Sequence, residues 1–267
     1  MVRNVVWTLA VALLVAIPAG AVGGQAAPQR RTRVVRVAAA SDLQFAMAEV
    51  VKAFEAQHRD IRVDVAYGSS GTYHAQILQR APFDMYLSAD MSYPRDLIAK
   101  GFASKDGAFL YAIGQIVLWV RQQSPIPVER LGMEALKDGA IRHVAIANPL
   151  HAPYGRAAEA ALRSAGMLDR VRPKFVFGEN VAQAAQFVES GAADIGIIAR
   201  SLALAPPMRA KGRYWEIPRD AHPTLEQGGL ILKAARDPGA ANLLRRFMES
   251  AEARTILMKF GFMLPGN

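Results

Sequence analysis

The sequence contains no cysteine among its 267 residues. Disulfide bonds and thiolate metal sites are therefore excluded, and so is a lipid chain attached to a cysteine. The catalytic motif H-E-x-x-H and the phosphate-binding P-loop are also missing. The five histidines lie in no recognised catalytic signature. These absences argue against a metalloprotease, a nucleotide hydrolase or a thiol enzyme, and predict a protein that is not an enzyme and needs no cofactor.

The N-terminal segment lacks an apolar run long enough to span a membrane. Residues 5–18 give about 14 mainly apolar positions, whereas a membrane-spanning helix needs about 20. This run follows Arg3 and precedes Ala19-Gly20-Ala21, a cleavage pattern of small residues. The arrangement predicts a secretory signal peptide over residues 1–27, with a second plausible cut near Ala26. Without a lipid anchor, the mature protein is expected to be free in the periplasm.

The sequence has no strongly basic patch, although its net charge is +9. Arg30, Arg31 and Arg33 precede the first predicted strand, and the other basic residues are dispersed along predicted helices. Nowhere do basic and aromatic residues alternate as they do in nucleic-acid-binding surfaces. We therefore expect no nucleic-acid partner, and a surface with a general attraction for anions.

Short apolar runs alternate with helical patterns along the rest of the chain, which predicts an α/β fold. Apolar residues at i, i+3 and i+4 spacings between Phe45 and Phe54 indicate an amphipathic helix after the first strand. Strands are predicted at residues 34–40, 61–65, 83–87, 116–120, 143–146, 175–177, 194–198 and 228–232. Two further helices are expected in the tail, the last ending at Phe260.

The two series of strands predict two lobes, each a mainly parallel sheet flanked by helices. Lobe 1 is expected over residues 33–113 with a return segment at 228–267, and lobe 2 over residues 114–227. In open α/β sheets, ligands bind beyond the carboxyl ends of the strands, where helices begin. The ligand is therefore expected in the cleft between the lobes.

Four turns between a predicted strand and a predicted helix have the composition of an anion site. They contain glycine, hydroxyl and amide residues, and they occupy residues 40–42, 68–72, 148–155 and 178–181. The first turn of a helix presents unpaired N–H groups and a partial positive charge. Each turn taken alone is better explained by ordinary helix capping. Four such turns distributed over both lobes favour one shared anion site.

The motifs resemble those of periplasmic molybdate-binding proteins, in order, over nearly the whole mature chain. The matching segments are residues 38–43 (AAASDL), 68–72 (GSSGT), 81–90 (APFDMYLSAD), 148–149 (NP), 152–155 (APYG), 178–184 (GENVAQA), 194–198 (DIGII), 222–228 (HPTLEQG) and 260–262 (FGF). The resemblance implies a type II periplasmic binding fold that captures molybdate or tungstate. It also implies a partner, the membrane permease of an ABC importer. A carrier that presents both lobes to a transporter is expected to be a monomer.

The resemblance also implies which residues hold the oxyanion, with no direct metal-ion ligand among them. They are Ser41, Asp42, Ser70, Tyr154 and Val181. Asp42 and Val181 would contribute only backbone N–H groups, and the acidic side chains of Asp42 and Glu179 are expected to point outward, away from an anion. Some members of the family place a tyrosine hydroxyl where this chain has Ala199, and others use the tyrosine of the Ala-Pro-Tyr-Gly turn. Tyr154 is therefore expected to supply the phenolic donor.

Molybdate and tungstate are dianions without a proton, so a cage made only of donors satisfies all four of their oxygens. Hydrogen phosphate would leave its O–H unpaired, at a cost of about 1–3 kcal/mol. Sulfate has the same charge and shape, and only its smaller size would exclude it. Sulfate and phosphate therefore remain the alternative ligands.

The residues in and beside these turns also bear on an organic carboxylate ligand, a ferric-ion ligand and a hydrolase activity. An organic carboxylate would favour an arginine clamp, and the nearest arginine, Arg156, is expected to face solvent. A ferric-ion site would need paired tyrosines, which Tyr67 and Tyr73 do not make. A serine hydrolase is the alternative of another class, because residues 68–72 approach the G-x-S-x-G motif, with Thr72 in place of the last glycine.

Overall fold

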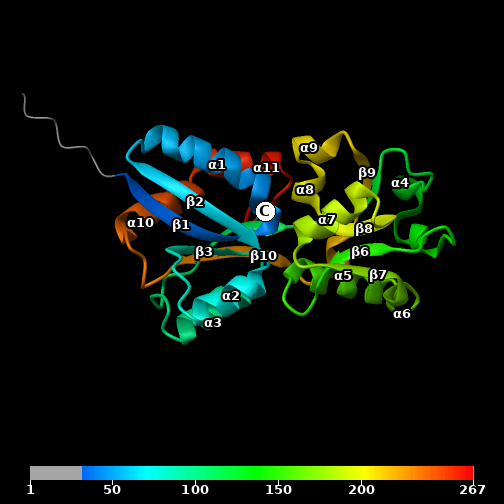
Figure 1. The fold of residues 1–267 in the computed structure, drawn as a ribbon, viewed down its shortest axis with the longest axis horizontal. Helices are drawn as coiled ribbons and strands as arrows, with labels where there is room; N and C mark the ends of the chain where they lie inside the picture. The colour runs from blue at the N-terminus through cyan, green and yellow to red at the C-terminus, as the bar shows by residue number, and fades with distance from the viewer. Residues whose placement is uncertain (1–31, 267) are drawn as a thin grey trace, which may run out of the picture. The chain divides into compact units, whose positions relative to one another are not determined.

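The computed structural model describes residues 32–266, which form two five-stranded sheets flanked by helices (Figure 1). The predicted α/β architecture is confirmed. In this part of the chain, no helix combines the length and the apolar character that crossing a membrane requires. The predicted signal peptide, residues 1–27, lies outside the described residues.

Lobe 1 is built on the sheet with strand order β2-β1-β3-β10-β4. Its strands are β1 (Arg33–Ala40), β2 (Ile61–Gly68), β3 (Met85–Ser88), β4 (Phe109–Gly114) and β10 (Leu225–Ile231). Its helices are α1 (Gln44–Gln57), α2 (Ser70–Leu78), α3 (Ser92–Ala99), α10 (Pro238–Met248) and α11 (Ala251–Lys259), with the 3-10 turn η1 (Ser41–Leu43). Strands β1, β2 and β3 are parallel, and β10 runs antiparallel to both β3 and β4. The three parallel strands therefore end at one edge of the sheet.

The alternation of side chains along β1 divides the core of lobe 1 into two layers. Val35 and Val37 belong to the buried cluster that includes Phe54 of α1, to which α10 and α11 also contribute. Ala38 faces the other way, into the cluster formed with Ile77 of α2 and with α3. Figure 1 shows α1 and α11 on one side of the sheet and α2 and α3 on the other.

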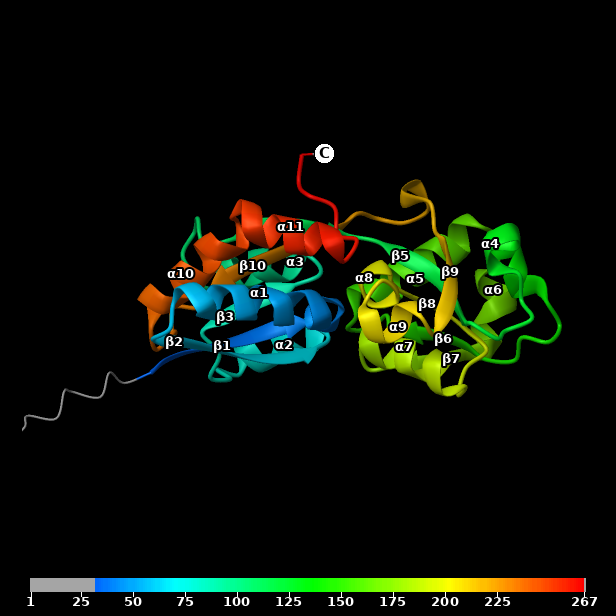
Figure 2. The same ribbon diagram turned by 90° about the horizontal axis from the view of Figure 1, so that it is seen from above.

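Lobe 2 is built on the sheet with strand order β7-β6-β8-β5-β9. Its strands are β5 (Ile116–Arg121), β6 (Val144–Ala147), β7 (Phe175–Gly178), β8 (Ile195–Ala199) and β9 (Gly212–Glu216). Its helices are α4 (Val128–Leu131), α5 (Pro153–Ser164), α6 (Leu168–Val171), α7 (Val181–Ser190), α8 (Arg200–Ala203) and α9 (Pro206–Arg209). Short 3-10 turns lie at η2 (Gly132–Lys137), η3 (Arg172–Lys174) and η4 (Arg219–Ala221). Strands β6, β7 and β8 are parallel, and β5 is antiparallel to β8 and β9. Helices α5 and α7 lie on opposite faces of this sheet (Figure 2).

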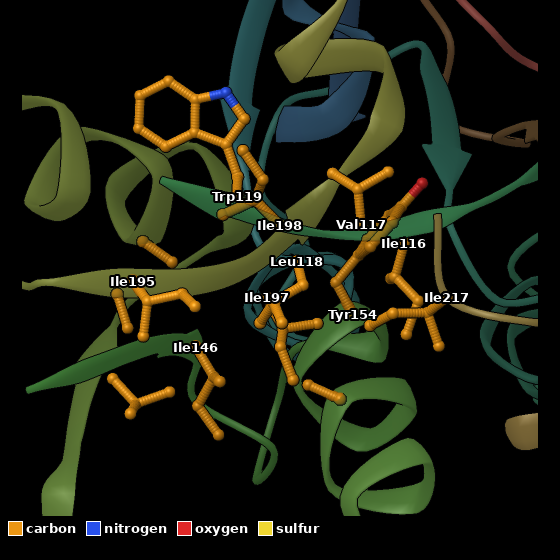
Figure 3. Close-up of a cluster of buried hydrophobic side chains, with 14 of the residues drawn as sticks. Ile116, Val117, Leu118, Trp119, Ile146, Tyr154, Ile195, Ile197, Ile198 and Ile217 are labelled. Carbon is orange, nitrogen blue, oxygen red and sulfur yellow. The ribbon is translucent and has the colours of Figure 1, made fainter. Parts of the chain in front are cut away.

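The core of lobe 2 is centred on β5, whose residues from Ile116 to Val120 are at most 1% exposed. Figure 3 shows Ile116, Val117 and Leu118 beside isoleucines of β6 and β8 and the ring of Tyr154 from α5. Burial of these side chains stabilises the lobe by about 25 cal/mol for each Å² of apolar surface removed from water. Because the Tyr154 ring belongs to this core, packing fixes the place of its hydroxyl group.

The chain passes between the lobes twice. A single residue, Gln115, separates β4 of lobe 1 from β5 of lobe 2, and residues 217–224 lead back from β9 to β10. Beside the first passage, Ile113 and Met263 form an isolated antiparallel bridge with N–O distances of 2.8 and 3.0 Å. The C-terminal segment is thus attached to lobe 1 at the point where the chain leaves it.

Candidate functional site

A small cavity lies where the two lobes meet, and all four of the predicted turns contribute to it. From lobe 1 it is lined by Ala40, Ser41, Asp42, Gly68, Ser69, Ser70 and Ala89, and from lobe 2 by Ala152, Pro153, Tyr154, Asn180 and Val181. None of these lining residues is a lysine or an arginine. The cavity is therefore bounded by neutral groups, apart from the carboxyl group of Asp42.

The structure brings the five predicted site residues together around this cavity. Ser41, Tyr154 and Val181 are each 3% exposed. Asp42 and Ser70 are each 1% exposed. Residues more than a hundred positions apart thus share one enclosed space.

Three helices begin at the cavity wall, and their first turns supply backbone donors. Helix α2 starts at Ser70, α5 at Pro153 and α7 at Val181. The Asn180 side chain caps α7 by accepting from Ala182 N at 3.0 Å and from Gln183 N at 3.1 Å. This cap leaves the N–H of Val181 without an intrahelical acceptor, as is usual for the first residue of a helix. The convergence of helix N-termini gives the cavity a positive potential without any cationic side chain.

The hydroxyl groups of Ser41 and Ser70 accept hydrogen bonds from the protein. Ser70 Oγ accepts from Ala89 N at 3.0 Å, and Ser41 Oγ accepts from Ala182 N at 3.3 Å. A serine hydroxyl has one hydrogen to donate, and neither of these bonds uses it. Both hydrogens are therefore available to an acceptor in the cavity.

The prediction that the Asp42 side chain points outward is wrong. Its carboxyl group is buried, and Oδ2 accepts a hydrogen bond from Tyr154 OH at 2.9 Å. Tyr154 OH in turn accepts from Gln227 Nε2 at 3.3 Å, and Tyr111 OH lies 3.4 Å from Gln227 Oε1. The packing of α5 against lobe 1 therefore directs the Tyr154 hydroxyl to a carboxylate, and its role as the phenolic donor to the ligand stays a prediction.

Burial raises the pKa of Asp42 to about 7, because its hydrogen bonds with Tyr154 and Gln227 only partly offset the cost of removing the charge from water. Its second oxygen, Oδ1, is buried without a hydrogen-bond partner among the described residues. Burial also raises the pKa of Tyr154 well above its ordinary value. Asp42 is therefore the one lining residue whose charge changes near neutral pH.

Charged residues near the cavity are paired with each other. Arg156, expected to face solvent, is instead half-buried and donates to Asp90 Oδ2 at 2.6 Å and to Tyr93 OH at 3.1 Å. The Glu179 side chain does point outward, with 76% of its surface exposed, and its Oε2 lies 3.6 Å from His151 Nε2. An arginine clamp for an organic carboxylate is thus not formed by Arg156.

The hydroxyl group of Ser69 lies beside a histidine, which is the arrangement a serine hydrolase would require. His151 Nδ1 is 3.1 Å from Ser69 Oγ. However, Ser69 Oγ donates its hydrogen to the main-chain oxygen of His151, so the ring nitrogen does not receive it. A nucleophilic serine must give its proton to the base. The contact therefore connects the two lobes and does not activate the serine.

Further contacts join the lobes around the cavity. Gly71 N donates to His151 O at 2.9 Å, and Ser201 Oγ donates to the main-chain oxygen of Asp42 at 2.8 Å. A Cβ atom at Gly71 would lie only 2.6 Å from His151 O, so only glycine permits this approach.

Some of these roles were missed by the sequence analysis. Gln227 and Asn180 stand in the matched motifs. The preference of asparagine for helix N-caps indicates the capping role of Asn180, but no local pattern indicates that Gln227 would meet Tyr154. Ser201 and His151 act through contacts with the other lobe, which only the folded chain reveals.

Comparison with known proteins gives the family. The model for bacterial extracellular solute-binding proteins matches residues 35–263. The chain is 35% identical to the molybdate-binding protein ModA of Rhodobacter capsulatus over 75% of its length and 77% of that protein. It is 33% identical to ModA of Azotobacter vinelandii over 94% of its length and 97% of that protein. The solved structure of the Azotobacter vinelandii periplasmic molybdate-binding protein superposes with a TM-score of 0.80 at 30% identity, covering 86% of this chain and 99% of that one. The chain therefore belongs to the family of bacterial extracellular solute-binding proteins, and within it is similar to the molybdate-binding proteins.

Proposed function

We propose that this protein captures molybdate, and tungstate with it, in the cavity between the lobes and delivers it to an ABC importer. The observation that carries the proposal is a cavity walled by the N-termini of α2, α5 and α7 and by serine hydroxyls, without a lysine or an arginine. Relatives that share a third of the sequence are named molybdate-binding proteins, which supports the same ligand.

The protein groups proposed to bind the anion are the hydrogen-bond donors that face the cavity. Ser41 and Ser70 offer hydroxyl hydrogens, while Ser70, Val181 and Asp42 offer backbone N–H groups. Such donors match a dianion that carries four acceptor oxygens and no proton. Tyr154 is proposed to belong to the site together with Asp42, to which its hydroxyl group is hydrogen-bonded. The lobes close on the anion because the closed form alone presents donors from both lobes at once.

We place this function in the periplasm, after removal of the signal peptide predicted over residues 1–27. The family's description as extracellular supports export. The membrane permease of the importer is the proposed partner, and the protein is proposed to act as a monomer.

The decisive experiment measures ligand binding by the protein without its signal peptide. Isothermal titration calorimetry with molybdate, tungstate, sulfate, phosphate and chromate should give tight binding for the first two anions alone. Equal or tighter binding of sulfate or phosphate would reject the proposed ligand while leaving an oxyanion carrier. Binding of none of the five would reject the function. Hydrolysis of chromogenic esters that is lost in Ser70→Ala would instead favour the hydrolase alternative.

A further inference from the structure

The side chain of Asp42 is a buried acid at the edge of an anion site, and the proposed capture mechanism does not explain it. The residue lines the cavity and is 1% exposed. A carboxylate in this place would oppose an anion by like-charge repulsion, which is strong where water is excluded. Either the charge weakens binding or it is removed when the anion arrives.

The groups around the carboxyl offer hydrogen bonds but no compensating positive charge. Its partners are the neutral Tyr154 hydroxyl at 2.9 Å and, next to it, the Gln227 amide. Tyr111 is the other titratable group of this cluster, and burial raises its pKa well above its ordinary value. Both tyrosines therefore stay neutral over the pH range in which Asp42 changes its charge.

Charged residues on the elements that pack against η1 form ion pairs, accept from the main chain as Glu55 does, or lie exposed as Lys52 does. These ion pairs are Lys259–Glu49 involving α1, Lys211–Glu189 involving α7, Arg200–Glu216 involving α8 and Arg62–Asp64 within β2. His151 is the remaining titratable residue beside the cavity, and it contacts Ser69 and Glu179. Asp42 is thus buried beside neutral partners only.

We propose that Asp42 takes up one proton when the anion binds, so that the protein captures the dianion together with a proton from solvent. This inference rests on the proposed function and concerns the same site. The proton removes the negative charge that faces the ligand.

Protonation costs no hydrogen bond at this position. The contact between Asp42 Oδ2 and Tyr154 OH can be kept with the direction reversed, the carboxylic acid donating and the phenol oxygen accepting. Tyr154 then has its own hydrogen free, and Tyr154 lines the cavity. A single proton on Asp42 therefore removes the charge that repels the anion and lets the Tyr154 hydroxyl donate into the cavity.

Linkage fixes the sign and the size of the expected effect. The anion binds the form with a protonated Asp42, and this form is depleted as the pH rises above about 7. Affinity for molybdate should therefore weaken about tenfold between pH 6 and pH 8, and roughly a hundredfold between pH 6 and pH 9. Molybdate remains a dianion throughout this range, so the slope reports the protein.

The test is calorimetric titration of the protein with molybdate at pH 6, 7, 8 and 9. At pH 8 it is repeated in two buffers that differ in ionisation enthalpy, and this comparison counts the protons taken up. We expect close to one proton for each anion at pH 8 and close to none at pH 6. Asp42→Asn, a neutral residue of the same shape, should lose both the slope and the uptake. The proton count on the unaltered protein keeps the test valid if this variant folds poorly.

The outcomes separate this inference from the proposed function. Tight molybdate binding with constant affinity and no proton uptake would overturn the inference and leave the function standing. A slope that persists in Asp42→Asn and disappears in His151→Gln would assign the proton to the imidazole, and would also overturn it. Phosphate binding that strengthens with pH and is lost in Asp42→Asn would mean that a charged Asp42 accepts a hydrogen bond from protonated phosphate. That result would overturn both the proton-uptake inference and the proposed molybdate ligand. No binding of molybdate or tungstate at any pH would mean that the proposed function itself has failed.

Discussion

Single residues at the cavity show how neutral groups can be prepared for an anion. Ser41 and Ser70 each accept a hydrogen bond from a backbone N–H, which fixes the oxygen and leaves the hydrogen to be donated. In the proposed site, the same fixed geometry would discriminate between anions, because hydrogen bonds stretched beyond about 3.2 Å weaken and a rigid wall cannot follow a smaller ion. Selectivity for an anion would then come from serine oxygens that backbone N–H groups already hold in place.

The substitution Ser70→Ala tests whether the Ser70 hydroxyl group donates to the anion. The substitution removes one donor to the anion and leaves Ala89 N without its acceptor. Loss of such a hydrogen bond costs about 1–3 kcal/mol, so the affinity for molybdate should fall by roughly one to two orders of magnitude. Calorimetry measures it, with Ser104→Ala on the exposed surface as the matched control. An affinity equal to that of the control would remove Ser70 from the ligand set.

Asp42 also predicts how stability depends on pH in the absence of ligand. Its pKa is about 7 in the folded protein and near 3.8 when unfolded, so the folded state binds the extra proton between these values. Stability is therefore highest below pH 4 as far as this group is concerned, and it falls as the pH rises towards 7. The contribution that is lost amounts to roughly 4 kcal/mol at most.

Urea unfolding of the ligand-free protein at pH 5 and pH 8 measures this contribution. Other groups titrate as well, so the informative quantity is the difference between the parent and Asp42→Asn at each pH. We expect the parent to lose stability relative to the variant on going from pH 5 to pH 8. A difference that stays constant between the two pH values would show that the carboxyl is not titrating in this range.

At the scale of elements, the sequence predicts the strands and helices that build the cavity but omits some of the rest. The apolar runs of β1, β6 and β8 and the turns that follow them are predicted correctly because burial on both faces leaves a continuous apolar signal. Strand β2 and its turn are predicted from the alternation of apolar and polar residues, which matches its alternating burial. Strands β4 and β9 and helix α3 were not predicted. Strand β9 is short and only partly buried, and it lies at the edge of its sheet, so its sequence carries a weak pattern.

The direction of side chains in the site could not be predicted for a physical reason. Asp42 and Tyr154 are 112 positions apart, and Gln227 is a further 73 positions along the chain. Their mutual hydrogen bonds depend on how α5 meets lobe 1, which no local pattern encodes. The locations of the turns were predictable, and the pairing between them was not.

The start of α5 depends on Gly155. A Cβ atom at this position would overlap the carbonyl oxygen of Ala147, at the end of β6. Because that obstacle is backbone, Gly155→Ala should push α5 away from the sheet, with a destabilisation of about 1–3 kcal/mol and weaker molybdate binding through Tyr154.

Urea unfolding and calorimetry measure both effects. Gly139→Ala is the control, since a Cβ there meets nothing within 4 Å. Full stability together with full affinity in Gly155→Ala would show that the helix can shift without consequence.

At the scale of the whole described molecule, several polar contacts join the lobes around the cavity. Gly71 N to His151 O, Ala182 N to Ser41 Oγ and Ser201 Oγ to Asp42 O are hydrogen bonds across the cleft. Each of them requires the closed arrangement. A ligand that binds only this arrangement shifts the population towards it in proportion to its concentration.

Amide hydrogen exchange should report this shift. We expect saturating molybdate to slow exchange at Gly71 and Ala182, whose acceptors include groups of the other lobe. Asp84 N, which donates to Arg36 O at 2.8 Å within lobe 1, serves as the internal control. Equal slowing at all three amides would indicate general stabilisation, and no slowing at the first two would contradict closure.

The double passage of the chain between the lobes limits how the protein can release what it holds. Two backbone segments of fixed length prevent the lobes from drifting apart, and the bridge between Ile113 and Met263 stiffens one of them. The remaining motion is a hinge rotation of one lobe relative to the other about the line through both segments. A membrane partner that pulls on either lobe would therefore spread the far rim of the cleft and break its polar contacts in turn, while the joined side keeps its place.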